Sequence, residues 1–443
     1  ESGSMPYAQI HYPFENENVF NEGFPAQFIA EGLDQTRCWF YTLNVISVML
    51  YDKPAFKNVI VNGIILAEDG KKMSKRLRNY TPPDELISTY GADALRLYMI
   101  SSSLVKGEEQ RFSDDGVKNV VKTTLLPWYN AFKFFHTYAE IDQWKFNDLT
   151  THRTDLDRWI ISRLQTLKDN VNTHMMQYKL YLVVPSLLEF IEELTNTYIR
   201  MNRSRFWGEG YSQDKDAAYH TLYTVLSELS QLMAPFAPYL SESIYQSLKA
   251  FNPRNTAESV HLCSIPEAKQ QEQDKVLELG VTMLQEILNM ARQLRIKNSI
   301  KTKTPLPSIT VIHRDISTLR AVESLSERLC LELNVKDVLF SQDEEKFVSL
   351  YAKPNLPILG KKYGKKLPEI KNIIHNLSED ELRFYEQQNS LTAQQIRFGP
   401  DELLVYREIK SNTNANSNRH ITVSLDTTLT PELINEGLAR EIV

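Results

Sequence analysis

The sequence has few cysteines, no long apolar run and no excess of positive charge. Its cysteines, Cys38, Cys263 and Cys330, lie too far apart for a disulfide framework or a CxxC-type metal site, so we expect a reducing, intracellular compartment. No run of 18 apolar residues occurs, so we expect no membrane-spanning helix. The formal net charge of −6 argues against a nucleic-acid-binding protein, because such domains are often basic overall.

The remaining composition is that of a multidomain globular protein. Hydrophobic residues make up 42% and charged residues 24% of the 443 positions, which excludes a disordered tail, a collagen-like rod and a coiled coil. A chain of this length predicts two to four packing units.

The first 80 residues predict an α/β layer. A short strand-like run at 28–30 precedes residues 39–51, which are apolar on nearly all sides and predict a helix buried within the domain. Residues 58–67 are rich in β-branched side chains and end at the turn signal Asp69-Gly70, which predicts a strand. Apolar runs that alternate with helices favour a largely parallel sheet.

The middle of the chain predicts an antiparallel helix bundle. Apolar residues recur at three- and four-residue steps in four stretches, approximately 156–175, 180–206, 218–233 and 239–248. Polar residues 252–274 then predict a linker, and a long helix is expected over 276–296.

The last part predicts a small α+β module. Strand-like runs occur at 309–312, 338–340, 348–351 and 420–425. Ser378 and Glu381 have the spacing of a capping box at a helix start, and the polar stretch 411–419 predicts a loop. The chain ends inside a helix predicted to begin after Thr430, so we expect a cut end.

A basic loop follows the strand predicted for residues 58–67. Residues 70–76 read GKKMSKR, and a glycine-started loop with three lysines and an arginine can close over a polyphosphate and stabilise the charge of a transferring phosphoryl group. On composition alone, a solvated basic surface is the commoner explanation of such a run.

Several motifs favour a phosphate-binding role for this loop over a solvated surface. KMSKR resembles the KMSKS signature of class I aminoacyl-tRNA synthetases, and EGLDQTRCW at 31–39 resembles the EGxDQxRGW motif of their isoleucyl branch. The same family is matched by further segments, ESGSMPYA at 1–8, NY at 79–80, YGADALR at 90–96, DRW at 157–159 and MAPFAP at 233–238. The resemblance covers essentially the whole chain and is closest to the eukaryotic cytoplasmic form.

The resemblance implies catalytic roles for the signature loop. Lys75 would contact the phosphates of ATP and stabilise the adenylation transition state, while Lys72 and Ser74 would support the loop and its closure. ATP is thus implied as a substrate, with Mg²⁺ accompanying it and no metal site on the protein.

The resemblance also implies an adenylate site in the nonamer at 31–39. The implied roles are these: Glu31 contacts isoleucyl-adenylate, Gly32 permits close backbone approach, Asp34 and Gln35 bind the ribose and amino-acid ends, and Trp39 lines the side-chain pocket. A core role for Trp39, and helix N-terminal roles for the carboxylates, stay open as alternatives.

Two positions depart from the family pattern, and two elements are absent. Cys38 replaces a glycine, which could strain the backbone or crowd the pocket, and Arg76 replaces the last serine of KMSKS. The HIGH-type histidine motif and the editing domain do not occur, so we expect a fragment that begins inside the catalytic domain and is inactive alone. Isoleucine exceeds valine by one methylene, worth roughly 1–3 kcal/mol in a pocket, a range established on this family, so such a fragment could not edit.

The resemblance sets the expected domains and fold class. The fold is multidomain α/β plus all-α: part of a Rossmann-type catalytic domain with its signature loop (1–80), a stem-contact helical region (81–150), an antiparallel anticodon-binding bundle (151–265), a linker with a long helix (266–305) and an α+β module (306–443).

Transfer RNA would bind through local basic patches. Arg200, Arg203 and Arg205 lie beside Trp207, and arginine can contact phosphate while aromatic rings stack on bases; arginines that favour a helix C-terminus are an equal alternative. Two further patches, at 292–303 and 361–366, are solvated surface unless they share one face.

The predicted function is ATP-dependent activation of L-isoleucine and its transfer to tRNA(Ile) in the cytoplasm, without a membrane partner. The alternative is a non-catalytic tRNA-binding fragment of a class I synthetase. Membership of a larger synthetase complex stays open.

Overall fold

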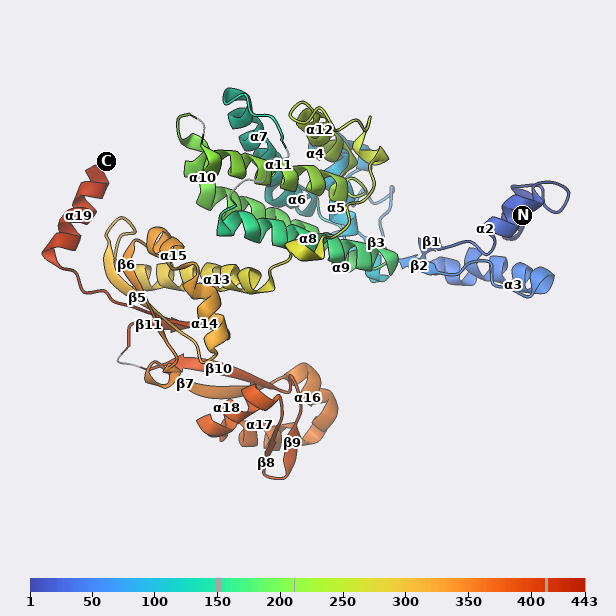
Figure 1. The fold of residues 1–443 in the computed structure, drawn as a ribbon. Coiled ribbons are helices and arrows are strands. Elements are labelled where there is room, and N and C mark those ends of the chain that lie inside the picture. The colour runs from blue at the N-terminus through green and yellow to red at the C-terminus, as the bar shows by residue number, and fades with distance from the viewer. Residues whose placement is uncertain (148–152, 211, 411–412, 443) are drawn as a thin grey trace. The chain divides into compact units, whose positions relative to one another are not determined.

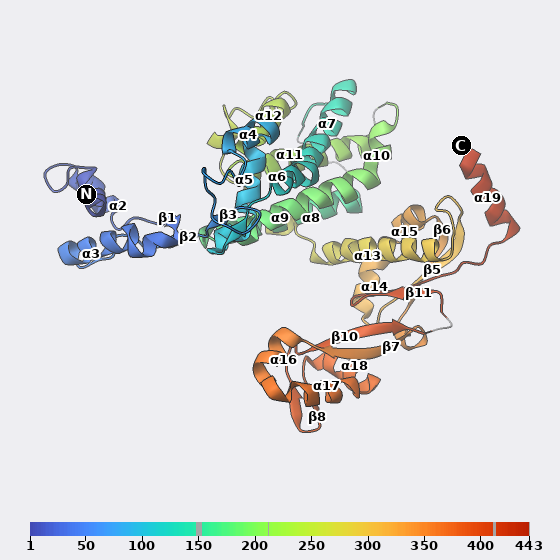
Figure 2. The same ribbon diagram turned by 180° about the vertical axis from the view of Figure 1, so that it is seen from behind.

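A computed structural model describes residues 1–147, 153–210, 212–410 and 413–442. The chain divides into two compact units, Glu1–Gln273 and Asp274–Val443, whose elements Figures 1 and 2 show from opposite sides. Across the described ranges, none of the helices has the length and apolar character needed to cross a membrane. The predicted boundary between residues 150 and 151 lies outside the described residues.

The N-terminal segment of the first unit is a small α/β arrangement. Its elements are η1 (Ser2–Ser4), α1 (Met5–Ala8), α2 (Glu17–Gly23), β1 (Ile29–Gly32), η2 (Leu33–Arg37), α3 (Trp39–Tyr51) and β2 (Val59–Asn62). Strands β1 and β2 pair in parallel, with Glu31 opposite Val61. A small core of Ile29, Phe40, Leu43 and Ala55 joins this strand pair to α3.

Helix α3 has the predicted bounds, but the prediction that it is buried on nearly all sides is wrong. Only Phe40, Leu43 and Ser47 of its residues are buried. Tyr41 is 63% exposed and Met49 is 79% exposed. The two-stranded sheet is too narrow to cover more than one face of the helix, so the other apolar face lies open.

The strand predicted over 58–67 is divided by Gly63. Strand β2 ends at Asn62, and β3 (Ile65–Leu66) pairs in parallel with β4 (Gln110–Arg111) instead. A Cβ atom on Gly63 would lie 1.7 Å from the carbonyl oxygen of Glu108, so only glycine fits where the two chain segments cross. Two separate parallel pairs therefore replace the single sheet predicted.

Helices form the rest of the first unit. The connecting region contains α4 (Pro83–Tyr90), α5 (Ala92–Ile100), α6 (Asp114–Val120) and α7 (Leu126–Ile141). The bundle contains α8 (Asp155–Met176), α9 (Leu180–Glu192), α10 (Arg200–Trp207), α11 (Gln213–Met233) and α12 (Pro238–Lys249). A π-helical segment, Glu193–Ile199, makes α9 and α10 one continuous helix, as the sequence predicted for 180–206.

The bundle has the closed core that its apolar periodicity predicted. Trp159, Tyr198 and Phe206 are among its fully buried side chains. The start of α8 is fixed by Thr154, whose hydroxyl and backbone N–H form a reciprocal capping box with Asp157.

The second unit is an α+β module whose described residues form three separate sheets. It begins with α13 (Lys275–Lys297), and its four-stranded sheet has the order β11-β12-β5-β6, formed by Ala415–Ser417, Thr422–Leu425, Leu306–Ile312 and Val335–Ser341. Helices α14 (Ile316–Glu323) and α15 (Ser326–Leu333) connect the parallel strands β5 and β6. The loop predicted over 411–419 is wrong at residues 415–417, which form strand β11. Residues 411–412 of that stretch lie outside the described residues.

A second sheet of this unit, formed by β7 and β10, packs against helices. Strands β7 (Val348–Pro354) and β10 (Leu403–Ile409) pair antiparallel, and α16 (Leu356–Tyr363), α17 (Leu367–His375) and α18 (Glu379–Gln388) lie beside them with the hairpin β8–β9 (Leu391–Ala393 and Ile396–Phe398) (Figure 1). The capping box of Ser378 and Glu381 at the start of α18 is confirmed. The last helix is α19 (Pro431–Ile442). The predicted class, α/β followed by an all-α bundle and an α+β module, is confirmed.

Candidate functional site

The predicted site residues at 31–39 lie where β1 ends and α3 begins. The Gln35 side chain accepts a hydrogen bond from the Trp39 backbone N–H at 3.1 Å and donates one to Asp34 Oδ2 at 3.0 Å. Gln35 therefore holds the Asp34 carboxylate and the first turn of α3 in one arrangement. This arrangement follows the carboxyl ends of two parallel strands, which is where α/β sheets bind ligands.

Gly32 makes room for this arrangement. A Cβ atom at Gly32 would lie 2.7 Å from Asp34 Oδ1, so any larger residue would displace the carboxylate. Glu31 and Asp34 are both exposed to solvent. The Asp34 carboxylate thus lies against the Gly32 backbone, and both carboxylates are accessible from solvent.

Trp39 connects the nonamer to the start of the chain. Its indole Nε1–H donates to the carbonyl oxygen of Ser2 at 3.1 Å, and its ring packs against the small core of the α/β segment. Next to Ser2, the buried Gly3 would bring a Cβ atom within 2.6 Å of Thr42 and Ile46 on α3. No role was predicted for Gly3 from the sequence, although its position in the matching segment at 1–8 is a signal that could have found it.

Cys38 lies between β1 and α3 with an exposed side chain. Its φ angle is −123°, which is outside the left-handed region that favours glycine, and its ψ angle is −102°, which is outside the usual α and β ranges. The expected backbone strain or pocket crowding at Cys38 stays a prediction.

The signature loop is held by its own backbone and by Asn79. Gly70 turns the chain with a φ of +78°, and the Gly70 N–H donates to the carbonyl of Ala67 at 2.8 Å. Asn79 Oδ1 accepts from the Ser74 N–H at 3.0 Å, and Asn79 Nδ2 donates to the Lys72 carbonyl at 3.2 Å. Asn79 thus links two backbone positions of the loop. The sequence predicted no such role for it, although the Asn-Tyr pair at 79–80 matches the family pattern.

The side chains of Lys72 and Lys75 are exposed on this loop. A polar cavity of about 370 Å³ lies beside the loop, and it is lined by Ala67, Glu68, Met73, Arg78, Asn79, Tyr80, Thr81, Phe112, Ser113, Asp114 and Asp115. Neither lysine lines it. Within the described ranges, no hydrogen bond or ion pair joins the loop lysines to Glu31 or Asp34, so the structure shows two separate clusters of predicted site residues.

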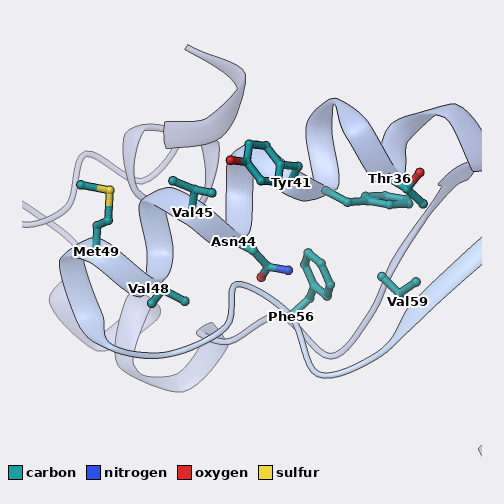
Figure 3. A pocket seen from close by; sticks show the side chains of 9 residues that line it. Thr36, Tyr41, Asn44, Val45, Val48, Met49, Phe56 and Val59 are labelled. Atoms are coloured by element: carbon teal, nitrogen blue, oxygen red, sulfur yellow. The ribbon is translucent and has the colours of Figure 1, made fainter.

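An apolar groove lies on the open face of α3. Its volume is about 640 Å³, and Figure 3 shows Val45, Val48 and Met49 along the helix with Phe56 and Val59 opposite them. Thr36, Phe40, Tyr41 and Asn44 complete the lining. Trp39, predicted to line an aliphatic pocket, is not among these residues.

Among the basic residues of the bundle, Arg205 is engaged inside the protein. Its guanidinium donates to both carboxylate oxygens of Asp157 at 2.9 Å and to Asp214 at 3.0 Å. Burial would raise the pKa of Asp157, but the hydrogen bonds and charge of Arg205 outweigh it and hold the pKa below its usual range. Burial, together with the charge of Asp157, raises the pKa of Tyr198, which donates to Asp157 at 2.6 Å.

The neighbours of Arg205 are more accessible. Arg203 is exposed, and Trp207 is 57% exposed. Arg200 Nε donates to the carbonyl of Asn196 at 2.8 Å and is partly buried. The four predicted tRNA-binding residues therefore divide into the internal Arg205, the partly buried Arg200 at the start of α10, and a surface pair, Arg203 and Trp207, near its end.

The patch predicted at 292–303 also contains an internal arginine. Arg295 is only 2% exposed, and its guanidinium donates to the backbone carbonyls of Lys301, Thr304, Leu333 and Asn334. In the patch at 361–366, Lys362 forms a 2.6 Å ion pair with Glu402. Over the described ranges, no three His, Cys, Asp or Glu side chains are grouped as a metal ion would need.

Comparisons with known families match both clusters and the bundle. Residues 1–113 match the family model described as tRNA synthetases class I (I, L, M and V). Residues 157–311 match the anticodon-binding domain of tRNA ligase. The chain belongs to the class I aminoacyl-tRNA synthetases.

Its curated relatives point to one branch of that class. The whole chain is 44% identical to "Isoleucine--tRNA ligase" of Protochlamydia amoebophila and 42% identical to "Isoleucine--tRNA ligase, cytoplasmic" of Saccharomyces cerevisiae, and it spans 43% of each. It is 41% identical to the cytoplasmic enzyme of Mus musculus and spans 37% of it. The chain thus covers less than half the length of these relatives, and its similarity to bacterial and eukaryotic ones is nearly equal.

Proposed function

We propose that this chain supplies the signature-loop part and the tRNA-binding bundle of an isoleucine–tRNA ligase, which activates L-isoleucine with ATP and transfers it to tRNA(Ile) in the cytoplasm. The observation that carries the proposal is the arrangement at 31–39. Gln35 fixes Asp34 and the start of α3 at the carboxyl ends of two parallel strands, in a motif specific to the isoleucyl branch.

In this proposal the signature loop acts on ATP. The ammonium group of Lys75 stabilises negative charge that develops on the phosphates as the carboxylate of isoleucine attacks the α-phosphate and pyrophosphate leaves. Lys72 and Ser74 keep the loop in its closed form, and Asn79 holds the backbone at both residues. Mg²⁺ accompanies ATP and neutralises part of its charge.

The nonamer binds the product of that step. Asp34 and Gln35 supply acceptors and a donor for the ribose and amino-acid ends of isoleucyl-adenylate, and Glu31 provides a second carboxylate beside them. Gly32 lets the Asp34 carboxylate lie against the backbone, where it can meet the adenylate, because no Cβ occupies that space. Trp39 borders the aliphatic side chain of isoleucine from its position at the start of α3.

The bundle receives tRNA through the surface end of α10. The exposed Arg203 contacts phosphate, and the exposed ring of Trp207 stacks on an unpaired base. Arg205 positions these residues from inside the protein through Asp157, and Arg200 holds the helix turn before them.

The test is isoleucine-dependent ATP–pyrophosphate exchange by the full-length protein that carries these residues. We expect exchange with isoleucine, and exchange with valine that is weaker by roughly 10- to 200-fold, because one methylene separates the two substrates. Salt-sensitive tRNA binding without any exchange would favour the non-catalytic alternative and reject the proposal.

A further inference from the structure

Helix α5 holds the connection between two bundle helices with two charged side chains. Asp93, only 7% exposed, accepts hydrogen bonds from the backbone N–H of Tyr239 at 3.3 Å and of Leu240 at 2.8 Å. One turn further along α5, Arg96 donates to the carbonyl of Pro235 at 2.9 Å. These three hydrogen bonds join residues that are 146, 147 and 139 positions apart in the sequence.

The connection needs these contacts because it cannot satisfy its own backbone. Helix α12 begins with Pro238, which has no N–H, and the residue before it, Ala237, has no side chain that accepts a hydrogen bond. The free N–H groups of the first turn would otherwise lack partners. Asp93 supplies both acceptors and places a negative charge at the positive end of the helix dipole.

The same helix α5 is tied to the strand beside the signature loop. The Tyr98 hydroxyl accepts from the Ser113 N–H at 3.2 Å and donates to the Arg111 carbonyl at 3.3 Å. Phe112 N–H then donates to the carbonyl of Leu66, four residues before Gly70, at 2.9 Å. A Cβ atom on Gly70 would lie 3.2 Å from the guanidinium of Arg111, so the loop's first turn lies directly against this strand.

We propose that Asp93 and Arg96 are positioning residues that fix the signature-loop segment against the tRNA-binding bundle. They join the synthetase match at 1–113 to the anticodon-domain match at 157–311, and they touch neither the loop lysines nor the nonamer. The inference rests on the proposed function. If the bundle binds tRNA and the loop acts on ATP, these two residues fix the distance between the tRNA-binding surface and the signature loop.

Their effect must then appear in the transfer step. Activation needs only the loop and the nonamer, whereas transfer needs the tRNA end to meet the adenylate, and a misplacement of about 1 Å in such a geometry slows a reaction by up to roughly 100-fold. Loss of Arg96 should therefore lower the kcat of aminoacylation by about tenfold or more at saturating tRNA, while isoleucine-dependent exchange and the KM for tRNA change little.

The main variant is Arg96→Ala in the full-length protein, because Arg96 is exposed and its loss leaves no buried charge. Asp93→Asn keeps one acceptor oxygen but turns the other into an NH2 group that faces a backbone N–H, so it should show an effect in the same direction. The matched control is Ser212→Ala. The Ser212 hydroxyl accepts from the Lys215 N–H at 3.1 Å and caps α11 inside the bundle without contacting α5.

A selective loss of transfer in Arg96→Ala, with normal transfer in Ser212→Ala, would support the proposal. Equal losses in the two variants would overturn it, because both would then report only bundle stability. A parallel fall in exchange and transfer by Arg96→Ala would also overturn it.

The failure of the proposed function can be recognised separately. If the unmodified protein shows no isoleucine-dependent exchange, the proposed function fails, and the positioning role is judged by amide hydrogen exchange instead. Arg96→Ala must then speed exchange at both Leu240 and Ser113, whereas Ser212→Ala must leave Ser113 unchanged. Protection of Ser113 that does not respond to Arg96→Ala would overturn the positioning role.

Discussion

Helix α3 and helix α8 show how differently the apolar side chains of two helices in the same unit are covered. Trp159 of α8 is 1% exposed within a bundle whose helices cover one another. Met49 of α3 is 79% exposed, because only two short strands and a few core residues cover that helix. Apolar sequence thus indicates a surface able to pack, while the neighbouring elements decide whether it is covered.

The largest expected effect on stability comes from removing the buried Trp159 of α8. Trp159→Ala should lower the free energy of unfolding of the bundle by about 3–5 kcal/mol, because it leaves a large cavity among fully packed side chains. Met49→Ala should change stability by less than about 0.5 kcal/mol, because its side chain is already in solvent. Urea denaturation of both variants measures the difference, and equal destabilisation would contradict the packing described for α3.

The next effect concerns the two arginines of α10. Arg205→Ala should destabilise the bundle by about 3–5 kcal/mol, since it leaves the buried Asp157 carboxylate without its charged partner. Arg203→Ala should leave stability within about 0.5 kcal/mol and weaken tRNA binding. Thermal unfolding together with a tRNA titration separates the two, and a tRNA defect in Arg205→Ala at unchanged stability would refute its internal role.

The same ion pair predicts a pH dependence. Because the folded pKa of Asp157 is lowered, its contribution is fully present above the unfolded value near 3.9 and is lost as the pH falls through the lower folded value. Unfolding midpoints between about pH 6 and pH 2 should therefore fall more steeply for the unmodified protein than for Arg205→Ala. Parallel curves would show that Asp157 gains nothing from Arg205.

A smaller loss of stability than in the bundle is expected in the signature loop. Asn79→Ala removes two hydrogen bonds to the backbone of the signature loop, so stability should fall by only about 1 kcal/mol. Isoleucine-dependent exchange should fall by about tenfold, because the loop no longer holds Lys75 in place. Ser88→Ala, which removes an exposed hydroxyl bond to the Glu85 carbonyl on α4, is the control; an equal loss of exchange there would contradict a specific role for Asn79.

The sequence predicted the elements better than their surroundings. The bounds of α3 follow from its apolar run and those of the four bundle helices from periodicity, but the exposure of α3 depends on partners that neither pattern describes. Gly63 lies inside the strand predicted for 58–67, and its long-range contact with Glu108, which sequence does not reveal, divides that strand. The capping box of Ser378 and Glu381 was readable because both partners lie within one turn.

The site shows the same limit. The motifs identified Lys75 and Asp34, whose roles remain predictions, because signature residues keep a fixed spacing along the chain. Arg205 and Arg295 were grouped with surface charges, since sequence does not reveal a carboxylate 48 residues away or four carbonyls that converge on one guanidinium. The contacts of Asp93 with α12 could not be predicted either, because they join residues 146 and 147 positions apart in the sequence.

The most direct test of the proposed function is Lys75→Ala, compared with Lys71→Ala in the same loop. Lys71 forms an exposed 3.4 Å ion pair with Asp69 and has no proposed catalytic role. The proposed mechanism predicts that Lys75→Ala slows isoleucine-dependent ATP–pyrophosphate exchange by about 100-fold or more while tRNA binding is largely retained, and that Lys71→Ala has little effect on either. Equal effects of the two substitutions on exchange would contradict the assignment of Lys75, and a parallel loss of exchange and tRNA binding in Lys75→Ala would indicate a folding defect instead.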